Sequence, residues 1–233
     1  MIYIKKDKTP VFLRQYQADR ATDFKSLPKE AKDKLRKSLM DEQSGLCAYC
    51  MSKLGSNPSS DVKIEHIHPQ SRHPEQDLSY SNLLAVCPGN PVPFSSGSFY
   101  SGSSSQSLTC DSCKGDKELF LSPLKPEIEK LIAYDNSGNI SAAKNLDPQT
   151  KEMVDHDLNT VLNLNHRWLV NNRKKALQTY KAEINQKFGK GKEIKPEFWR
   201  RQEKFYSNGG GRNTPYVGIL LWFIRRYINQ SSR

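Results

Sequence analysis

The sequence lacks a long apolar run and an apolar segment at its start. Its most apolar stretch, residues 216–224, is far shorter than the roughly 20 residues with which a helix crosses a bilayer. The opening residues Met1-Ile-Tyr-Ile-Lys-Lys-Asp do not form the hydrophobic region of a secretory signal. These absences predict a soluble protein of the cytoplasm.

The chain also lacks the Gly-x-x-x-x-Gly-Lys-Ser/Thr loop with which many proteins bind the phosphates of ATP or GTP. Any dependence on ATP must therefore come from a partner. Cysteine is scarce, and all five cysteines lie between residues 47 and 113. Because disulfides are rare in the cytoplasm, this clustering predicts metal ligands rather than cross-links or separate small buried side chains.

Acidic residues are fewer than basic ones. The sequence has 36 Lys and Arg against 25 Asp and Glu, a formal net charge of +11. A surplus of positive charge of this size favours an anionic partner, most simply nucleic acid.

Composition and periodicity divide the chain into three segments of an α+β protein. They are an N-terminal strand with a lead-in helix, a central core, and a mainly helical region for partner or nucleic-acid contacts, at residues 1–45, 46–125 and 126–233. The strand is expected at Tyr3 and Ile4, and the helix opens at Pro28 and stops at Gly45. The core contains an insert at residues 88–109 that is rich in Ser, Gly and Pro, a composition that cannot bury enough apolar surface to fold alone.

The third segment begins with a predicted hairpin. Residues 131–134 and 139–142 flank Asp135-Asn-Ser-Gly138, which has the composition of a tight turn. Helical periodicity, capping residues and prolines then predict four helices, at about 147–164, 166–188, 196–206 and 214–228.

The core is organised around the stretch from Val62 to Pro69, which places a carboxylate and two imidazoles at Glu65, His66 and His68. We interpret this stretch as a strand of an active site. Strand alternation sends Glu65 and His66 to opposite faces, so both reach one substrate only if the strand twists or ends there.

Cys47-x-x-Cys50 has the spacing of two thiolates that share one tetrahedral ion, for which Zn²⁺ is the usual occupant in the cytoplasm. The partner pair is open: Cys110 with Cys113 has the same spacing, and Cys87 with Cys110 serves equally well if the insert loops out. Spacing alone does not choose between them.

The motifs together resemble those of HNH endonucleases with a zinc-stabilised ββα-metal finger. The residues that carry the resemblance are Cys47-x-x-Cys50, Glu65-His66-Ile-x-Pro69, Asn82-Leu83, Cys87 and Cys110-Asp111-x-x-Lys114-Gly115. More narrowly, residues 44–120 resemble the PtuB-like nuclease subunits of Septu and retron anti-phage systems. The resemblance implies hydrolysis of phosphodiester bonds in DNA or RNA, and it implies Cys87 and Cys110 as the second zinc pair.

The resemblance also implies roles for the other motif residues. His66 is the general base, and Glu65 and Asp111 hold a catalytic Mg²⁺ or Mn²⁺, although Asp111 stands where most HNH enzymes have Asn or His. Asn82 fixes the loop that carries His66. The partner that the resemblance implies is a PtuA-like ATPase subunit of the ABC or SMC type, within a retron complex in some systems.

Other polar residues of the core have two interpretations. His68, Arg72, Lys114 and Lys117 are candidate nucleic-acid contacts, or else part of an ordinary solvated surface. Of the three remaining histidines, His73 is expected to be a loop residue, and His156 and His166 are expected to be structural. Two rival functions stay open: a zinc-finger module that binds nucleic acid without cutting it, and a redox or iron–sulfur protein.

Overall fold

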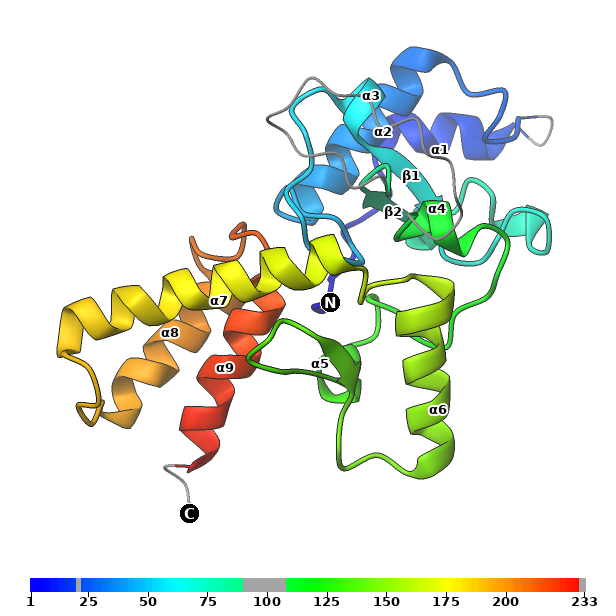
Figure 1. The fold of residues 1–233 in the computed structure, drawn as a ribbon. Helices are drawn as coiled ribbons and strands as arrows, with labels where there is room; N and C mark the ends of the chain where they lie inside the picture. The colour runs from blue at the N-terminus through cyan, green and yellow to red at the C-terminus, as the bar shows by residue number, and fades with distance from the viewer. Residues whose placement is uncertain (20–21, 90–107, 231–233) are drawn as a thin grey trace, which may run out of the picture.

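The computed structural model describes residues 1–19, 22–89 and 108–230. Within these ranges the chain is α+β, with many helices and two small antiparallel sheets of two strands each. Figure 1 shows two halves: one contains α1, α2, α3, β1, β2 and α4, and the other contains α5 to α9. A single buried hydrophobic cluster includes residues from both halves, from Met1 to Ile224.

The first half is built from short elements around one long helix. In chain order they are α1 (Val11–Ala18), α2 (Lys29–Glu42), α3 (Pro58–Asp61), β1 (Lys63–His66), the 3₁₀ turns η1 (Pro74–Gln76) and η2 (Tyr80–Asn82), β2 (Leu83–Val86) and α4 (Asp111–Lys114). The predicted helix after Pro28 is confirmed as α2. Its Ala31, Leu35 and Leu39 are buried at helical spacing, and its Lys29, Lys34 and Lys37 are exposed.

The strand predicted at Tyr3 and Ile4 is wrong. The backbone there is outside any sheet: the amide of Ile4 donates to the carbonyl of Pro123 at 2.8 Å, and the amide of Tyr3 donates to the Glu129 carboxylate at 3.0 Å. Isolated bonds of this kind anchor the segment without forming a ladder. Helix α1, which follows Pro10, was not predicted.

The central sheet pairs β1 with β2 in antiparallel register, with Glu65 opposite Leu84 and His66 opposite Leu83. All four residues of β2 are buried, and α2 packs beside it. On the free edge of β2, the side chain of Gln43 pairs with the backbone of Ala85. Its Oε1 accepts from the Ala85 N–H at 2.8 Å, and its Nε2 donates to the Ala85 carbonyl at 2.7 Å. The sheet is therefore held firmly against α2.

The predicted hairpin is confirmed as β3 (Ile132–Tyr134) and β4 (Ile140–Ala142), which follow the short helix α5 (Ile128–Leu131). Asp135 closes the turn, because its carboxylate accepts from the amides of Ser137 and Asn139 at 2.8 and 2.9 Å. Gly138 has φ of +92°, and a Cβ there would lie 2.2 Å from the carbonyl oxygen of Val170. Glycine is required at this position because α7 passes so close.

The four predicted helices are present with changed ends. The structure has α6 (Pro148–His156), a π-helical turn η4 (Asp157–Val161), α7 (Arg167–Phe188), α8 (Pro196–Asn208) and α9 (Val217–Gln230). The α-helix expected to run to about residue 164 stops at His156, where the buried Asp157 carboxylate accepts from the amide of Leu121 at 2.8 Å. We attribute the change from α-helix to the wider π-helical turn at Asp157 to this hydrogen bond, which draws the Asp157 side chain toward Leu121.

The last helix begins at Val217, three residues later than Thr214, which was expected to cap it. Tyr216 has φ of +61°, and its amide donates to the carbonyl of Met51 at 2.8 Å. This bond ties the start of α9 to the cysteine-containing loop of the other half. The apolar face of α9 is core, with Val217, Ile219 and Ile224 fully buried.

Arg173 joins α7 to the hairpin and is buried, with 1% of its surface exposed. Its guanidinium donates to the carbonyls of Gly138 and Leu164 at 2.6 and 2.7 Å. We expect Arg173→Ala to lower the free energy of unfolding by about 3–5 kcal/mol, because it leaves a cavity and two buried carbonyls without donors. Urea denaturation measures this, with the exposed neighbour Lys174→Ala as the matched control. A loss below about 1 kcal/mol would contradict the role assigned to Arg173.

The insert predicted at residues 88–109 lies for the most part outside the described residues, at 90–107. Its two ends are described, and they meet. The amide of Thr109 donates to the carbonyl of Gly89 at 2.9 Å, and the Thr109 hydroxyl donates to the same oxygen at 3.2 Å. We call this contact the neck of the insert.

Among the described residues, the helices are all too short or too polar to span a lipid bilayer.

Candidate active site and metal centre

Four cysteine side chains meet where the first half contacts the second. Cys47 and Cys50 lie on the turn after α2, Cys87 follows β2, and Cys110 precedes α4. Their sulfur atoms all lie within 4.8 Å of one another, and the measured Sγ–Sγ distances are 3.9 Å for Cys47–Cys110, 3.8 Å for Cys50–Cys87 and 3.7 Å for Cys87–Cys110. Four sulfurs at about 2.3 Å around a tetrahedral ion would be about 3.8 Å apart. The cluster can therefore hold one metal ion.

Backbone hydrogen bonds shape the turn that presents the first pair. The amide of Cys47 donates to the carbonyl of Ser52 at 2.9 Å, and the amide of Met51 donates back to Cys47 at 3.0 Å. Met51 has φ of +61°, which lets the chain reverse within the Cys-x-x-Cys spacing. The amide of Ala48 then donates to Ala85 in β2 at 3.1 Å, so the turn is fixed to the central sheet.

Cys110 is held in an uncommon backbone conformation, with φ of 55° and ψ of −139°. A residue with a side chain occupies this region only where its surroundings enforce it. Here the amide of Cys110 donates to the carbonyl of Leu162 at 2.9 Å, and the side chain is fully buried among the other thiols.

The sequence left two pairings open, and the structure brings together Cys87 and Cys110. Cys113 lies outside the cluster on α4, where its sulfur is 3.9 Å from the carbonyl oxygen of Thr160. The thiols of the cluster share protons: hydrogen bonds from the other three, Cys110 first, hold the pKa of Cys50 well below its ordinary value. One thiolate is thus favoured, which is the form that binds a cation.

His66 ends β1 with its imidazole largely buried, 7% of the residue being exposed. Its Nε2 lies 2.9 Å from the carbonyl oxygen of Asp77, and the edge of the Phe24 ring packs against the imidazole at a centroid distance of 4.8 Å. Since a carbonyl only accepts, Nε2 carries the proton and Nδ1 carries the lone pair in the neutral ring. Burial lowers the pKa of His66, although Asp77 acts in the opposite direction. The imidazole is therefore a neutral base at pH 7.

Glu65 faces the other side of the strand, as alternation predicts, and is 3% exposed. Its Oε1 accepts from the Tyr49 hydroxyl at 2.8 Å and lies 2.9 Å from Nζ of Lys114. Burial, together with a hydrogen bond to Asp111, raises the pKa of Glu65 to about 8, outweighing the lysine. The two carboxyl groups therefore share a proton at neutral pH.

Two lysines form ion pairs with these carboxyl groups, Lys114 with Glu65 and Lys63 with Asp111. Lys114 lies between Glu65 and the carbonyl of His66, to which it donates at 3.0 Å, and Lys63 lies 3.1 Å from Asp111. The structure thus brings Glu65 and Asp111 together, and their oxygens are suitable donors for a hard divalent cation. Glu65 and Asp111 would hold such a cation in place of the shared proton, with Lys114 and Lys63 nearby.

Asn82 fixes the loop after His66 through three hydrogen bonds. Its side chain accepts from the amide of His68 at 2.8 Å and donates to the carbonyls of His68 and Gln76 at 3.1 and 3.3 Å. Asn82 is 3% exposed, and its partners are all backbone groups.

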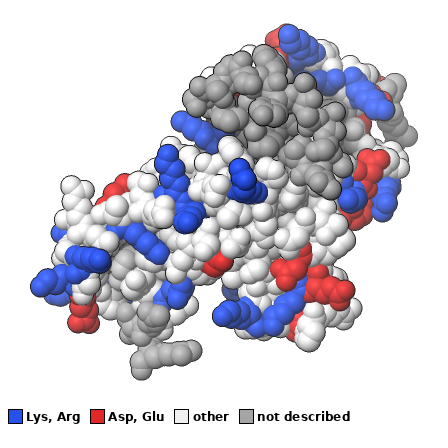
Figure 2. Space-filling model, in the orientation of Figure 1, with Lys and Arg blue, Asp and Glu red and all other residues white. Residues whose placement is uncertain are grey.

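The predicted nucleic-acid contacts fall into two groups. His68, Arg72 and Lys117 are exposed, so they remain available to a polyanion. The prediction that Lys114 contacts nucleic acid from the surface is wrong. Lys114 is 1% exposed, and its ammonium group is paired with Glu65. On the face drawn in Figure 2, Lys and Arg side chains lie over both halves rather than in a single stripe.

Sequence reasoning missed three residues that shape the site. Asp77 and Phe24 contact the imidazole of His66, Asp77 through its carbonyl oxygen and Phe24 through its ring. The Asp77 carboxylate accepts from the amide of Phe24 at 2.5 Å and from the side-chain amide of Gln70. Tyr49, the second residue inside Cys-x-x-Cys, is buried against Glu65. Only Tyr49 had a signal, its place inside the Cys47-x-x-Cys50 turn. Asp77 and Phe24 lie in segments with no recognisable pattern.

No protein-family model matches the sequence. A search of curated proteins finds no match either.

Proposed function

We propose that this protein is a metal-dependent endonuclease of the HNH type that hydrolyses phosphodiester bonds in DNA or RNA. The observation that carries the proposal is the arrangement of β1, β2 and α4. They place a neutral histidine at the end of β1, near enough for the charges of Asp111 and Lys114 to act on its pKa, on a scaffold in which four cysteines meet. The motif resemblance points to the same chemistry.

The ion proposed for the four-cysteine cluster is Zn²⁺. Thiolate donors select soft or borderline ions, and the sulfur separations match tetrahedral coordination. Four protein ligands leave no position for substrate, so this ion would act on the fold and not in the reaction.

In the proposed reaction His66 is the general base. Nδ1 takes a proton from a water molecule, whose oxygen bonds to phosphorus while the bond from phosphorus to the leaving oxygen breaks. The carbonyl of Asp77 holds the ring in the required tautomer by accepting from Nε2. Asn82 positions the loop that follows, without touching substrate.

Glu65 and Asp111 would hold the catalytic Mg²⁺ or Mn²⁺. Such an ion supplies charge stabilisation at the phosphate and at the leaving oxygen. Lys114 orders this carboxyl pair by joining α4 to β1.

The second candidate is a zinc module that binds nucleic acid without cutting it. It is favoured by the pairing of Lys114 with Glu65 and of Lys63 with Asp111, and by the small exposed fraction of His66. Cleavage assays separate the two candidates, because only the nuclease releases new ends.

The proposal extends to an anti-phage effector that works with an ATPase subunit. It rests on the motif resemblance and on the lack of a phosphate-binding loop in this chain. Purified protein should therefore be incubated with labelled DNA and RNA panels, with Mg²⁺, Mn²⁺ or a chelator. Each reaction is run with and without the product of a neighbouring ATPase gene. Metal-dependent strand scission is the expected result, and binding without scission would favour the second candidate.

The pH dependence of cleavage should follow the titration of His66. Its pKa is lowered by burial, so the neutral, active form persists below the ordinary imidazole pKa of about 6.5 and is lost only at lower pH. NMR titration of the ring protons, assigned with a His66→Gln variant, should give the same midpoint as the acid limb of the cleavage rate. A midpoint above the ordinary value would contradict this assignment. Thermal melts at each pH serve as the control for unfolding.

A further inference from the structure

A second group of metal-ligating side chains lies beyond the carboxyl pair. Nδ1 of His68 is 3.4 Å from one carboxylate oxygen of Glu118, and Nε2 of His73 is 3.1 Å from the other. The two imidazole centroids are 5.1 Å apart, and the three ligand atoms lie within 4.8 Å of one another. We propose that His68, His73 and Glu118 bind a divalent transition-metal ion of the Mn²⁺, Co²⁺ or Zn²⁺ kind.

The separations suit such an ion. With bonds of about 2.0–2.2 Å, ligand atoms around a tetrahedral centre would be about 3.3–3.6 Å apart. The distance from Nδ1 of His68 to one Glu118 oxygen, 3.4 Å, lies in this range, and that from Nε2 of His73 to the other oxygen, 3.1 Å, lies just below it. To bind one ion, the three ligand atoms, which lie within 4.8 Å of one another, would move closer together.

The ligands are held in place from outside the group. The side chain of Asn82 fixes the backbone of His68, because it accepts from the His68 amide and donates to the His68 carbonyl. The amide of His73 donates to the carbonyl of Pro69 at 2.9 Å, which closes the loop that carries both histidines. Nδ1 of His73 also lies 3.4 Å from the Glu75 carboxylate, a second partner of the kind that orients metal-binding imidazoles.

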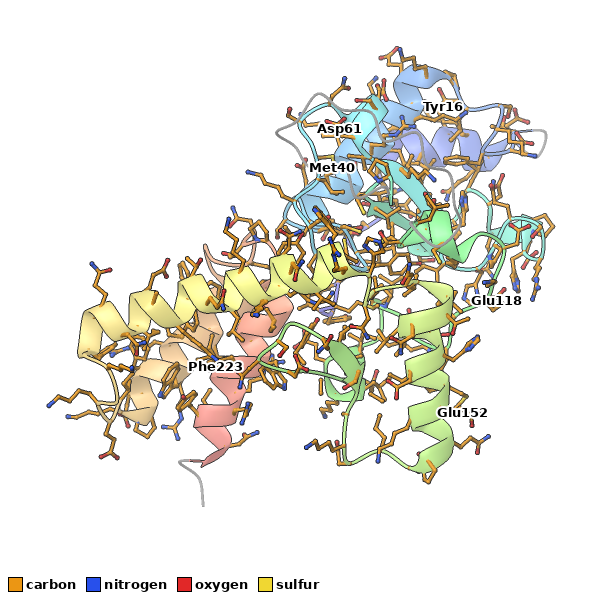
Figure 3. All side chains as sticks on the ribbon, in the orientation of Figure 1. Tyr16, Met40, Asp61, Glu118, Glu152 and Phe223 are labelled. Carbon is orange, nitrogen blue, oxygen red and sulfur yellow. The ribbon has the colours of Figure 1, made fainter. Side chains whose placement is uncertain are left out.

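The third ligand comes from a different segment. Glu118 follows α4, and Figure 3 shows it at the edge of the first half, on the side away from α7, α8 and α9. Because the loop after β1 and the segment after α4 supply the ligands together, the group forms only when the fold around the four cysteines is complete.

Two imidazoles and one carboxylate select transition ions over Mg²⁺ or Ca²⁺, which prefer oxygen donors. Three protein ligands leave at least one position for water or an anionic oxygen. The side chains are accessible, with 49% of His68 and 34% of His73 exposed. The group thus differs from the closed four-cysteine cluster in donor chemistry and in access. The inference does not depend on nuclease activity.

The test is a titration of the zinc-loaded, full-length protein with Co²⁺, without nucleic acid. We expect Co²⁺ to bind with ligand-field absorbance and without sulfur-to-cobalt charge transfer, because no thiolate takes part. The binding that is lost in His73→Ala belongs to this site, and any ion held by Glu65 and Asp111 is unchanged in that variant. His73→Ala and Glu118→Gln should each weaken binding by at least about tenfold. His156→Ala, which removes an exposed histidine elsewhere, should leave binding unchanged.

Three outcomes would overturn the proposal: no binding of Co²⁺ to the wild type, equal binding by the variants and wild type, or charge-transfer bands showing that the cysteines take the ion. Thermal melts establish that the variants are folded. Failure of the nuclease proposal would appear only in cleavage assays, so the two results stay separate.

Discussion

His66→Gln will reduce phosphodiester cleavage by at least about a hundredfold, the size of effect expected when a general base is removed. Glutamine is chosen because its side-chain amide can still donate to the carbonyl of Asp77, as Nε2 of His66 does. The variant therefore removes the lone pair of Nδ1 while keeping the buried hydrogen bond. Initial rates on the substrate identified in the panels measure the loss.

Two further variants make this result interpretable. His66→Ala should be equally inactive and also less stable, since it leaves the Asp77 carbonyl without its donor. His156→Ala should cleave at the wild-type rate, because that histidine is exposed at the end of α6, in the other half. If His66→Gln cleaves normally while folded, another group is the base and the proposed mechanism fails.

Cys110→Ser will abolish stoichiometric binding of the ion that we propose for the four-cysteine cluster, and it will lower the free energy of unfolding by at least about 3 kcal/mol. Cys110 supplies one of four sulfurs, and it holds a backbone conformation that is unfavourable without such support. Metal analysis and urea denaturation measure the two effects.

Cys113→Ser is the matched control for Cys110→Ser. Cys113 lies one helical turn away on α4 but outside the cluster, so its removal should change neither metal content nor stability appreciably. Equal losses in the two variants would mean that the ion is bound differently from the arrangement in the structure.

Much of the cysteine cluster and of β1 could be predicted from the sequence. Two thiols three residues apart have a local signature, and alternation correctly places Glu65 and His66 on opposite faces. The choice of Cys87 over Cys113 came only from the motif resemblance. It depends on how the chain closes around the insert, and spacing carries no information about that closure.

The features of Lys114 and His73 that the sequence did not predict have a common cause. Lys114 has the sequence character of a surface cation, yet α4 turns it inward to a carboxyl group that is distant in sequence. His73 lies in a loop, as predicted, but the sequence did not indicate that this loop brings it to Glu118. Both outcomes are set by contacts between segments about 45 to 50 residues apart, which no local pattern encodes.

The neck joins Gly89 to Thr109, two residues that are 20 apart in the sequence and lie close to Cys87 and Cys110. Because both ends are already joined, replacing residues 90–107 with a short linker should leave Cys87 and Cys110 at the same spacing. Gly89 is the residue that such a replacement must keep, since a Cβ there would lie 2.2 Å from the carbonyl oxygen of Thr109. The distance between Cys87 and Cys110 is therefore expected to depend on the neck and not on the length of the sequence between its two ends.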